Sequence, residues 1–114
     1  MEKRFSLERP DVVNQLDKMR PADKDFPEKV RKFSEALEAV TCPTLNYRED
    51  TVSLLPRQYI CAKNAFRDMM DGKLEDGWWE IYDFLTASEE SVLTFAEMHM
   101  LCMLCELYAE RLSD

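Results

Sequence analysis

The sequence predicts an all-α protein, a compact bundle of about five helices with a long, largely buried C-terminal helix. Only two glycines, Gly72 and Gly77, occur among 114 residues, and a chain so poor in glycine cannot form many tight hairpin turns. Residues 88–112 read as one helix that is apolar nearly all the way round, whereas an ordinary surface helix is apolar along one stripe. Such a helix must be covered on several sides, and shorter amphipathic helices of the same chain would cover it.

Two amphipathic helices are expected in the first part of the chain. The first spans about Pro10 to Met19, because proline suits a first helical position and Pro21 ends the element. The second begins at Pro27, and its apolar residues recur at helical spacing until the Cys-Pro pair at 42–43 stops it.

The longest stretch without helical periodicity, residues 41–55, separates these helices from the third. We expect three apolar side chains to hold this stretch against the rest of the protein: Leu45, Tyr47 and Val52. The third helix begins at Pro56 and ends at Gly72. Its apolar side is expected to carry Tyr59, Ile60, Phe66, Met69 and Met70, and its basic side Arg57, Lys63 and Arg67.

A short fourth helix and the long final helix complete the bundle. The fourth is expected over residues 76–85. The final helix should begin after Thr86-Ala87-Ser88-Glu89, which has the Ser/Thr-x-x-Glu pattern of a capping box. The links between the last helices are short, which predicts that neighbouring helices pack antiparallel or at steep angles.

The length and composition are those of one helical domain, residues 1–114, with a flexible segment at residues 1–8. The four cysteines are expected to be reduced thiols, because a chain of this size builds a core without disulfides. No apolar run approaches the roughly 20 residues of a membrane span, and the N-terminus is too charged for a signal peptide. We therefore expect a cytoplasmic protein that does not contact a membrane.

The net charge of −8 is concentrated in the C-terminal part of the chain. Residues 1–70 carry 13 Lys or Arg and 12 Asp or Glu, whereas residues 71–114 carry 2 Lys or Arg and 11 Asp or Glu. A field of that sign repels nucleic-acid phosphates and attracts basic protein surfaces. A helix-turn-helix reader is also excluded, because the segment in the reader's position, residues 75–80, is acidic.

The fourth helix carries the candidate partner-binding surface. Trp78 lies on the apolar face of this helix, whereas Trp79 points about 100° away, toward a group of carboxylates. Tryptophan is enriched among binding hot spots, and a ring of carboxylates would pair with Lys or Arg of a partner. The expected contact residues are Glu75, Asp76, Trp79, Glu80 and Asp83. The alternative is that Trp79 packs beneath residues 41–55 or against Phe5 and Leu7.

The final helix offers an alternative contact surface for a second copy of the chain. One of its faces begins polar and becomes apolar toward the C-terminus. The apolar part carries Leu101, Leu104 and Tyr108, and if exposed it would join copies into a homodimer or a larger scaffold. The sequence is therefore compatible with both a monomer and a homodimer.

The same helix contains zinc-ligand residue types in the pattern His99-x-x-Cys102-x-x-Cys105. Each step of three residues drifts by about 60° around a helix, so a straight helix cannot aim all three side chains at one ion without strain. The simpler interpretation is that these cysteines fill the core beside methionines. We therefore expect no bound metal and no cofactor.

Two carboxylate pairs, Glu35-x-x-Glu38 and Glu80-x-x-Asp83, each project from one helical face. The pattern resembles the all-α nucleoside-triphosphate pyrophosphohydrolases, whose Glu-x-x-Glu and Glu-x-x-Asp motifs lie on adjacent helices. That resemblance covers four residues and implies a magnesium-dependent nucleotide hydrolase. The gap between the two pairs is far longer here than in the family, and a proline-bearing loop intervenes.

The favoured function is that of a non-catalytic interaction protein. The sequence contains no Gly-x-Ser-x-Gly motif and no glycine-rich phosphate loop. The acidic C-terminal part and the surroundings of Trp79 indicate that the chain binds a basic surface of another protein, such as one that handles nucleic acid. Immunity and anti-defence proteins that inhibit by occupying a partner's surface are analogous. The homo-oligomeric scaffold and the pyrophosphohydrolase-like enzyme are the alternatives.

Overall fold

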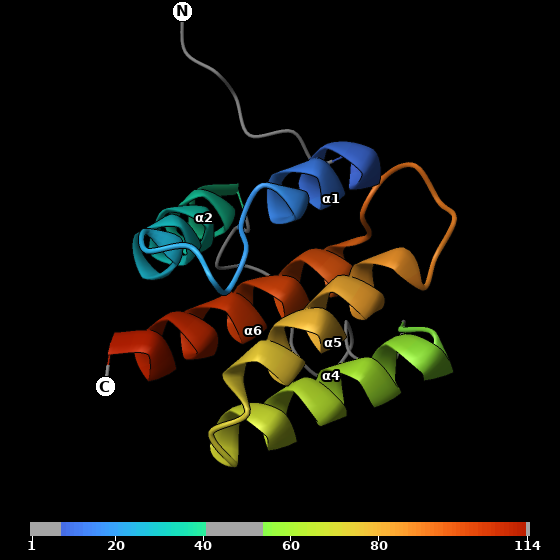
Figure 1. Ribbon diagram of the computed structural model, residues 1–114. Helices are drawn as coiled ribbons and strands as arrows, with labels where there is room; N and C mark the ends of the chain where they lie inside the picture. The colour runs from blue at the N-terminus through green and yellow to red at the C-terminus, as the bar shows by residue number, and fades with distance from the viewer. Residues whose placement is uncertain (1–7, 41–53, 114) are drawn as a thin grey trace, which may run out of the picture.

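Figure 1 shows the computed structural model, in which residues 8–40 and 54–113 are described. These residues form five helices and no β-strand, so the predicted all-α bundle is confirmed. The helices are α1 (Arg9–Asp17), α2 (Phe26–Val40), α4 (Pro56–Met70), α5 (Leu74–Thr86) and α6 (Phe95–Ser113). In the described part of the chain, no helix is both long enough and apolar enough to cross a membrane.

The first four predicted helices are present, with ends that differ by a few residues from those expected. The two glycines explain how α4 and α5 form a close hairpin. Gly72 has a φ of 79°, a left-handed conformation that glycine adopts at no steric cost. Gly77 faces α4, where an added Cβ would lie 3.4 Å from Met69 Cγ and 3.6 Å from the Ala65 carbonyl oxygen. The missing side chain therefore lets the two helix backbones approach each other.

The predicted start of the final helix, directly after the Thr86-x-x-Glu89 pattern, is wrong, because α6 begins at Phe95. The capping box is Thr94-x-x-Glu97: the Glu97 backbone N–H donates to Thr94 Oγ1, and the Thr94 N–H donates to Glu97 Oε1, both at 3.1 Å. The Thr86 hydroxyl instead donates to the Tyr82 carbonyl oxygen at the C-terminal end of α5. Residues 88–94 form a connection that runs past the N-terminus of α1.

α6 is the central helix of the fold. In Figure 1 it runs between α2 on one side and the α4–α5 hairpin on the other, and it packs against all three, while α1 packs against α5. An aromatic cluster joins these layers, with Trp78 of α5 5.1 Å from Phe26 of α2 and 5.3 Å from Tyr108 of α6, measured between ring centroids. The Tyr108 hydroxyl donates to the Leu74 carbonyl oxygen at 2.5 Å.

A buried polar network ties the N-termini of α1 and α6 to the α4–α5 hairpin. Arg9 Nη1 lies 2.5 Å from Glu97 Oε2, and the side chains of both residues are almost completely buried. Gln58 of α4 donates to the same carboxylate at 2.9 Å. Arg9 also donates to the backbone carbonyl oxygens of Leu85 and Glu90, at 2.9 and 2.7 Å. These contacts hold the N-termini of α1, α4 and α6 together.

The same network determines the charge of Glu97. Burial by itself would raise the pKa of the Glu97 carboxyl group. The hydrogen bonds from Arg9, the Thr94 backbone and Gln58, together with the charge of Arg9, outweigh burial and hold this pKa below its ordinary value. Glu97 is therefore an ionised, hydrogen-bonded member of the core.

Several predictions lie outside the described residues. They are the flexible segment at 1–8, of which residue 8 alone is described, the attachment of residues 41–53 through Leu45, Tyr47 and Val52, and the state of Cys42. The contacts proposed for Trp79 with Phe5, Leu7 or residues 41–53 fall there as well.

Candidate protein-contact surface

The outer face of α5 exposes most of the predicted partner-binding residues. Trp79 is 47 % exposed, whereas its neighbour Trp78 is 1 % exposed and lies in the core, as the 100° turn between successive helical residues requires. Glu75, Asp76 and Asp83 share the solvent side of α5 with Trp79. We call these four residues the α5 outer face.

The indole of Trp79 contacts the ring of its neighbour Tyr82. The two rings meet edge to face, with centroids 6.1 Å apart and planes 73° apart. Tyr82 is half-buried, and burial raises the pKa of its hydroxyl group, as do the charge of Asp17 on α1 and the hydrogen bond to that carboxylate. Trp79 therefore contacts a side chain that is hydrogen-bonded to a second helix, α1.

The carboxylates of the α5 outer face have no basic partner within the described part of the chain. No Lys or Arg lies within the 4.0 Å ion-pair distance of Glu75, Asp76 or Asp83 there. A partner's cations could pair with carboxylates placed in this way. Electrostatic complementarity of this kind governs the rate and specificity of association more than the affinity.

Glu80 differs from the other predicted contact residues because it is turned toward α4. It is hydrogen-bonded to Asn64, and burial and the neighbouring charge of Asp83 raise the pKa of its carboxyl group. Glu80 thus borders the α5 outer face and belongs to the α4–α5 interface.

The predicted self-association residues of α6 lie inside the protein. Leu101, Leu104 and Tyr108 are all fully buried by the neighbouring helices of the same chain. The polar-to-apolar trend along this face of α6 follows from its entry into the core, so these side chains are not available at the surface of a single folded chain.

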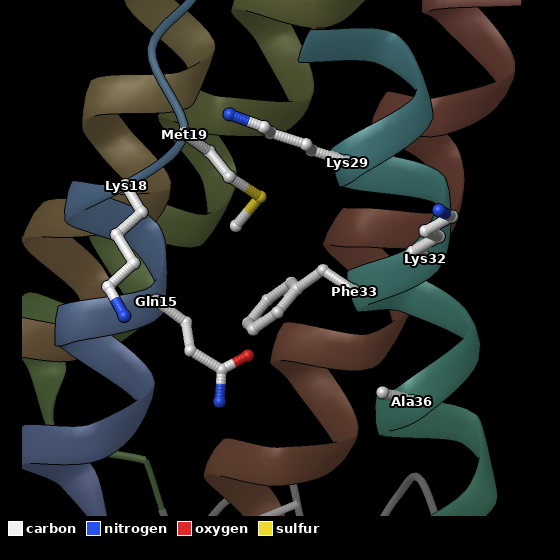
Figure 2. A pocket seen from close by; sticks show the side chains of 7 residues that line it. All are labelled: Gln15, Lys18, Met19, Lys29, Lys32, Phe33 and Ala36. Carbon is white, nitrogen blue, oxygen red and sulfur yellow. The ribbon is translucent and has the colours of Figure 1, made fainter. Parts of the chain in front are cut away.

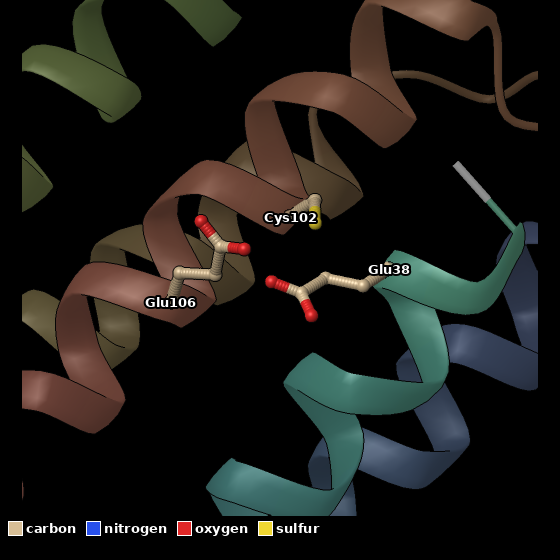
Figure 3. A group of neighbouring side chains, drawn as sticks. All are labelled: Glu38, Cys102 and Glu106. Atoms are coloured by element: carbon tan, nitrogen blue, oxygen red, sulfur yellow. The ribbon is translucent and has the colours of Figure 1, made fainter. Parts of the chain in front are cut away.

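The three predicted zinc-ligand residues do not converge. Cys105 is fully buried, and burial raises the pKa of its thiol, so the thiol remains protonated at neutral pH. Cys102 instead approaches Glu38 of α2 and Glu106 of α6, with ligand atoms within 4.8 Å of one another (Figure 3). These three side chains supply one ligand atom each, one fewer than the four protein ligands of a structural zinc site.

The four carboxylates that resemble the pyrophosphohydrolase motifs are separated in the fold. Glu38 lies between α2 and α6, whereas Glu80 lies between α5 and α4. α2 and α5 lie on different sides of α6 and do not pack backbone against backbone. The described residues therefore bring no four-carboxylate cluster together from these two pairs.

Sequence reasoning missed a shallow groove between α1 and α2. Figure 2 shows Gln15, Met19 and Phe33 pointing into it, and its volume is about 270 Å³. The lining residues are Gln15, Lys18, Met19, Lys29, Lys32, Phe33 and Ala36. Surface ion pairs hold Lys29 to Asp25 at 3.5 Å and Lys32 to Glu28 at 3.4 Å. The volume is below the roughly 300–1,000 Å³ of typical small-molecule sites.

The predicted apolar side of α4 is partly wrong. Tyr59, Ile60 and Met70 are exposed, at 48, 56 and 63 %. The buried side of α4 is made instead by Gln58, Cys61, Ala62, Ala65 and Met69. This side contacts α5, where Gly77 lies opposite Ala65 and Met69.

In comparisons with known proteins, the chain matches no protein-family model, no curated protein and no solved structure.

Proposed function

We propose that this chain is a non-catalytic interaction protein that binds a basic surface of another protein through the α5 outer face. The observation that carries the proposal is the exposure of Trp79 in the middle of three carboxylates that lack basic partners among the described residues. An aromatic anchor within a charged ring is the composition expected of a binding hot spot.

The rigidity of α5 supports this proposal. The opposite face of the helix is locked into the core by Trp78, Ile81, Phe84 and Leu85, all of which are at most 1 % exposed. A contact residue on such a helix loses little conformational freedom when a partner binds, so less of the interaction energy is spent on ordering it. The partner would be inhibited by having its basic surface covered, in the manner of an immunity or anti-defence protein.

The charge distribution points to the same class of partner. Residues 71–114 carry the whole excess of negative charge, and α5 lies in this segment. Such a field accelerates the encounter with a cationic surface. Proteins that handle nucleic acid have surfaces of this kind, because they bind phosphates. We also propose that the protein acts in the cytoplasm. Cys61, Cys102 and Cys105 are free thiols in the structure, and the cytoplasm keeps thiols reduced.

A capture experiment with matched variants tests the proposal. The immobilised full-length chain is incubated with lysate of its source organism, and the bound protein is identified by mass spectrometry. Trp79→Ala and Asp83→Lys should each reduce capture by about 10-fold or more. The matched controls are Val92→Ala, an exposed apolar residue away from α5, and Glu110→Lys, the same charge change on α6.

Stability measurements separate loss of binding from loss of folding. Asp83→Lys places a cation near the C-terminus of α5, where it interacts favourably with the helix dipole, so its melting temperature should not fall. The proposal is wrong if a folded Trp79→Ala, Asp83→Lys double variant captures the same partner as well as the unaltered protein does.

A further inference from the structure

The α4–α5 hairpin holds nearly all of the markedly exposed large apolar side chains in the described residues. Five of the six such residues lie on α4, at its N-cap or on α5, the exception being Val92. The five are Leu55, Tyr59, Ile60, Met70 and Trp79. A concentration of exposed apolar residues on one structural unit marks an interaction surface.

The exposed charges on the two helices of the hairpin are sorted by sign, whereas Asp68 of α4 is half-buried. The solvent side of α4 carries Arg57, Lys63 and Arg67. The solvent side of α5 carries the carboxylates of the α5 outer face. We call the first set the basic row of α4 and the second the acidic row of α5. Both helices pack against α6 with their buried sides, so both rows point away from α6 and belong to the same layer of the fold.

The register of the hairpin places the two rows level with each other. Glu80 is hydrogen-bonded to Asn64, and Gly77 lies next to Ala65 and Asp68. In an antiparallel pair with this register, Lys63 lies within about one helical turn of the height of Asp83, and Arg67 of the height of Asp76. No ion pair within 4.0 Å joins these side chains inside the described chain.

We propose that two copies of this chain associate face to face through the α4–α5 hairpins, with a two-fold axis parallel to the helices. This axis places α4 of each copy over α5 of the other and keeps each residue at the same height along the helix axes in both copies. Lys63 and Arg67 then face the acidic row of the second copy, while Ile60 and Trp79 exclude water between the rows. The result is an intermolecular four-helix arrangement.

Charge selects this orientation over the other two-fold arrangement. An axis that lies in the interface but runs across the helices would place α4 on α4 and α5 on α5. Basic residues would then face basic residues, and carboxylates would face carboxylates, which opposes association. Only the arrangement with the axis along the helices pairs opposite charges in both halves of the interface.

The size of the hairpin face predicts a weak dimer. The 15 residues of α4 span about 22 Å, and two adjacent helices are about 20 Å wide. Two such faces bury on the order of 800–900 Å² in total, below the roughly 1,200–2,000 Å² of stable complexes.

This inference rests on the proposed function in one respect, since both use the α5 outer face. A basic partner and a second copy would compete for it.

Sedimentation velocity of the full-length chain tests the dimer, over concentrations from about 1 µM to about 1 mM. We expect reversible dimers, and we expect Lys63→Glu and Asp83→Lys each to raise the dimer dissociation constant about 10-fold or more. An equimolar mixture of the two variants should recover dimers, because each reversed charge meets its opposite in the mixed pair. Lys32→Glu and Glu110→Lys, made away from the hairpin, should leave the constant unchanged.

Three outcomes would overturn the dimer. They are a monomer at all concentrations, a dimer unaffected by Lys63→Glu, and two weakened variants that do not recover when mixed. Circular dichroism shows whether each variant is folded. If a charge variant is not folded, Ile60→Gln, at a 56 % exposed position in the same interface, replaces it. Capture of the basic partner is measured separately with nanomolar chain. A monomer whose capture depends on Trp79 refutes the dimer alone, whereas a dimer whose Trp79 variant still captures refutes the proposed function alone.

Discussion

Glu97→Ala should be among the most destabilising single substitutions on a polar residue of this protein. Glu97 is 3 % exposed and Arg9 is 5 % exposed, so the substitution leaves a buried guanidinium without its carboxylate. Removing one partner of a buried ion pair costs about 3–5 kcal/mol. The loss includes the capping box of α6, which contributes about 0.5–2 kcal/mol. The carbonyl oxygens of Leu85 and Glu90 still accept hydrogen bonds from Arg9, which favours the lower part of this range.

Urea denaturation followed by circular dichroism at pH 7 measures this cost, with Glu110→Ala on the exposed side of α6 as the control. The double variant Arg9→Leu, Glu97→Leu should lose less stability than Glu97→Ala alone, because it removes both buried charges together. A loss of unfolding free energy below about 1 kcal/mol for Glu97→Ala would refute the coupling of Arg9 to Glu97. So would a double variant whose loss equals the sum of the losses of Arg9→Leu and Glu97→Leu measured singly.

Three further predictions concern stability. The pKa of Glu97 is lowered in the fold, so its contribution to the unfolding free energy is complete above the ordinary value of 4.5 and is lost as the pH falls through the lowered pKa. The unfolding free energy of Glu97→Gln should therefore depend less steeply on pH below 4.5 than that of the unaltered protein. Glu106→Lys places a cation beside Glu38 and should raise the unfolding free energy by up to about 1 kcal/mol, an effect that Glu110→Lys should lack and that salt should weaken. Gly77→Val forces side-chain atoms against Met69 and Ala65 and should cost about 1–3 kcal/mol in chemical denaturation, and an unchanged midpoint would show that the hairpin is not closely packed there.

The helices themselves were predictable because their apolar residues recur with helical period and prolines mark several of their starts. The start of α6 was not predictable from local pattern, since Thr86-x-x-Glu89 and Thr94-x-x-Glu97 both match a capping box. Only the second box brings its glutamate to Arg9, which is 88 residues away from Glu97 in the chain. A contact between such distant residues leaves no trace in a short window of sequence.

The buried side of α4 was mispredicted for a related reason. Hydrophobicity alone assigns Tyr59 and Ile60 to the core, but α5 approaches α4 closely where Gly77 lies against Ala65 and Met69, so the buried side of α4 is the side that carries these two residues. The different directions of Trp78 and Trp79 were predicted correctly, because they depend only on the turn of one helix and the positions of its apolar residues.

Zero-length carbodiimide cross-linking of the captured complex locates the contact surface, because it joins a carboxylate to a lysine only where the two are in contact. If the α5 outer face binds the partner, the cross-links to the partner's lysines start at Glu75, Asp76 and Asp83. Cross-links that start instead at the carboxylates of α2, with none on α5, would contradict it.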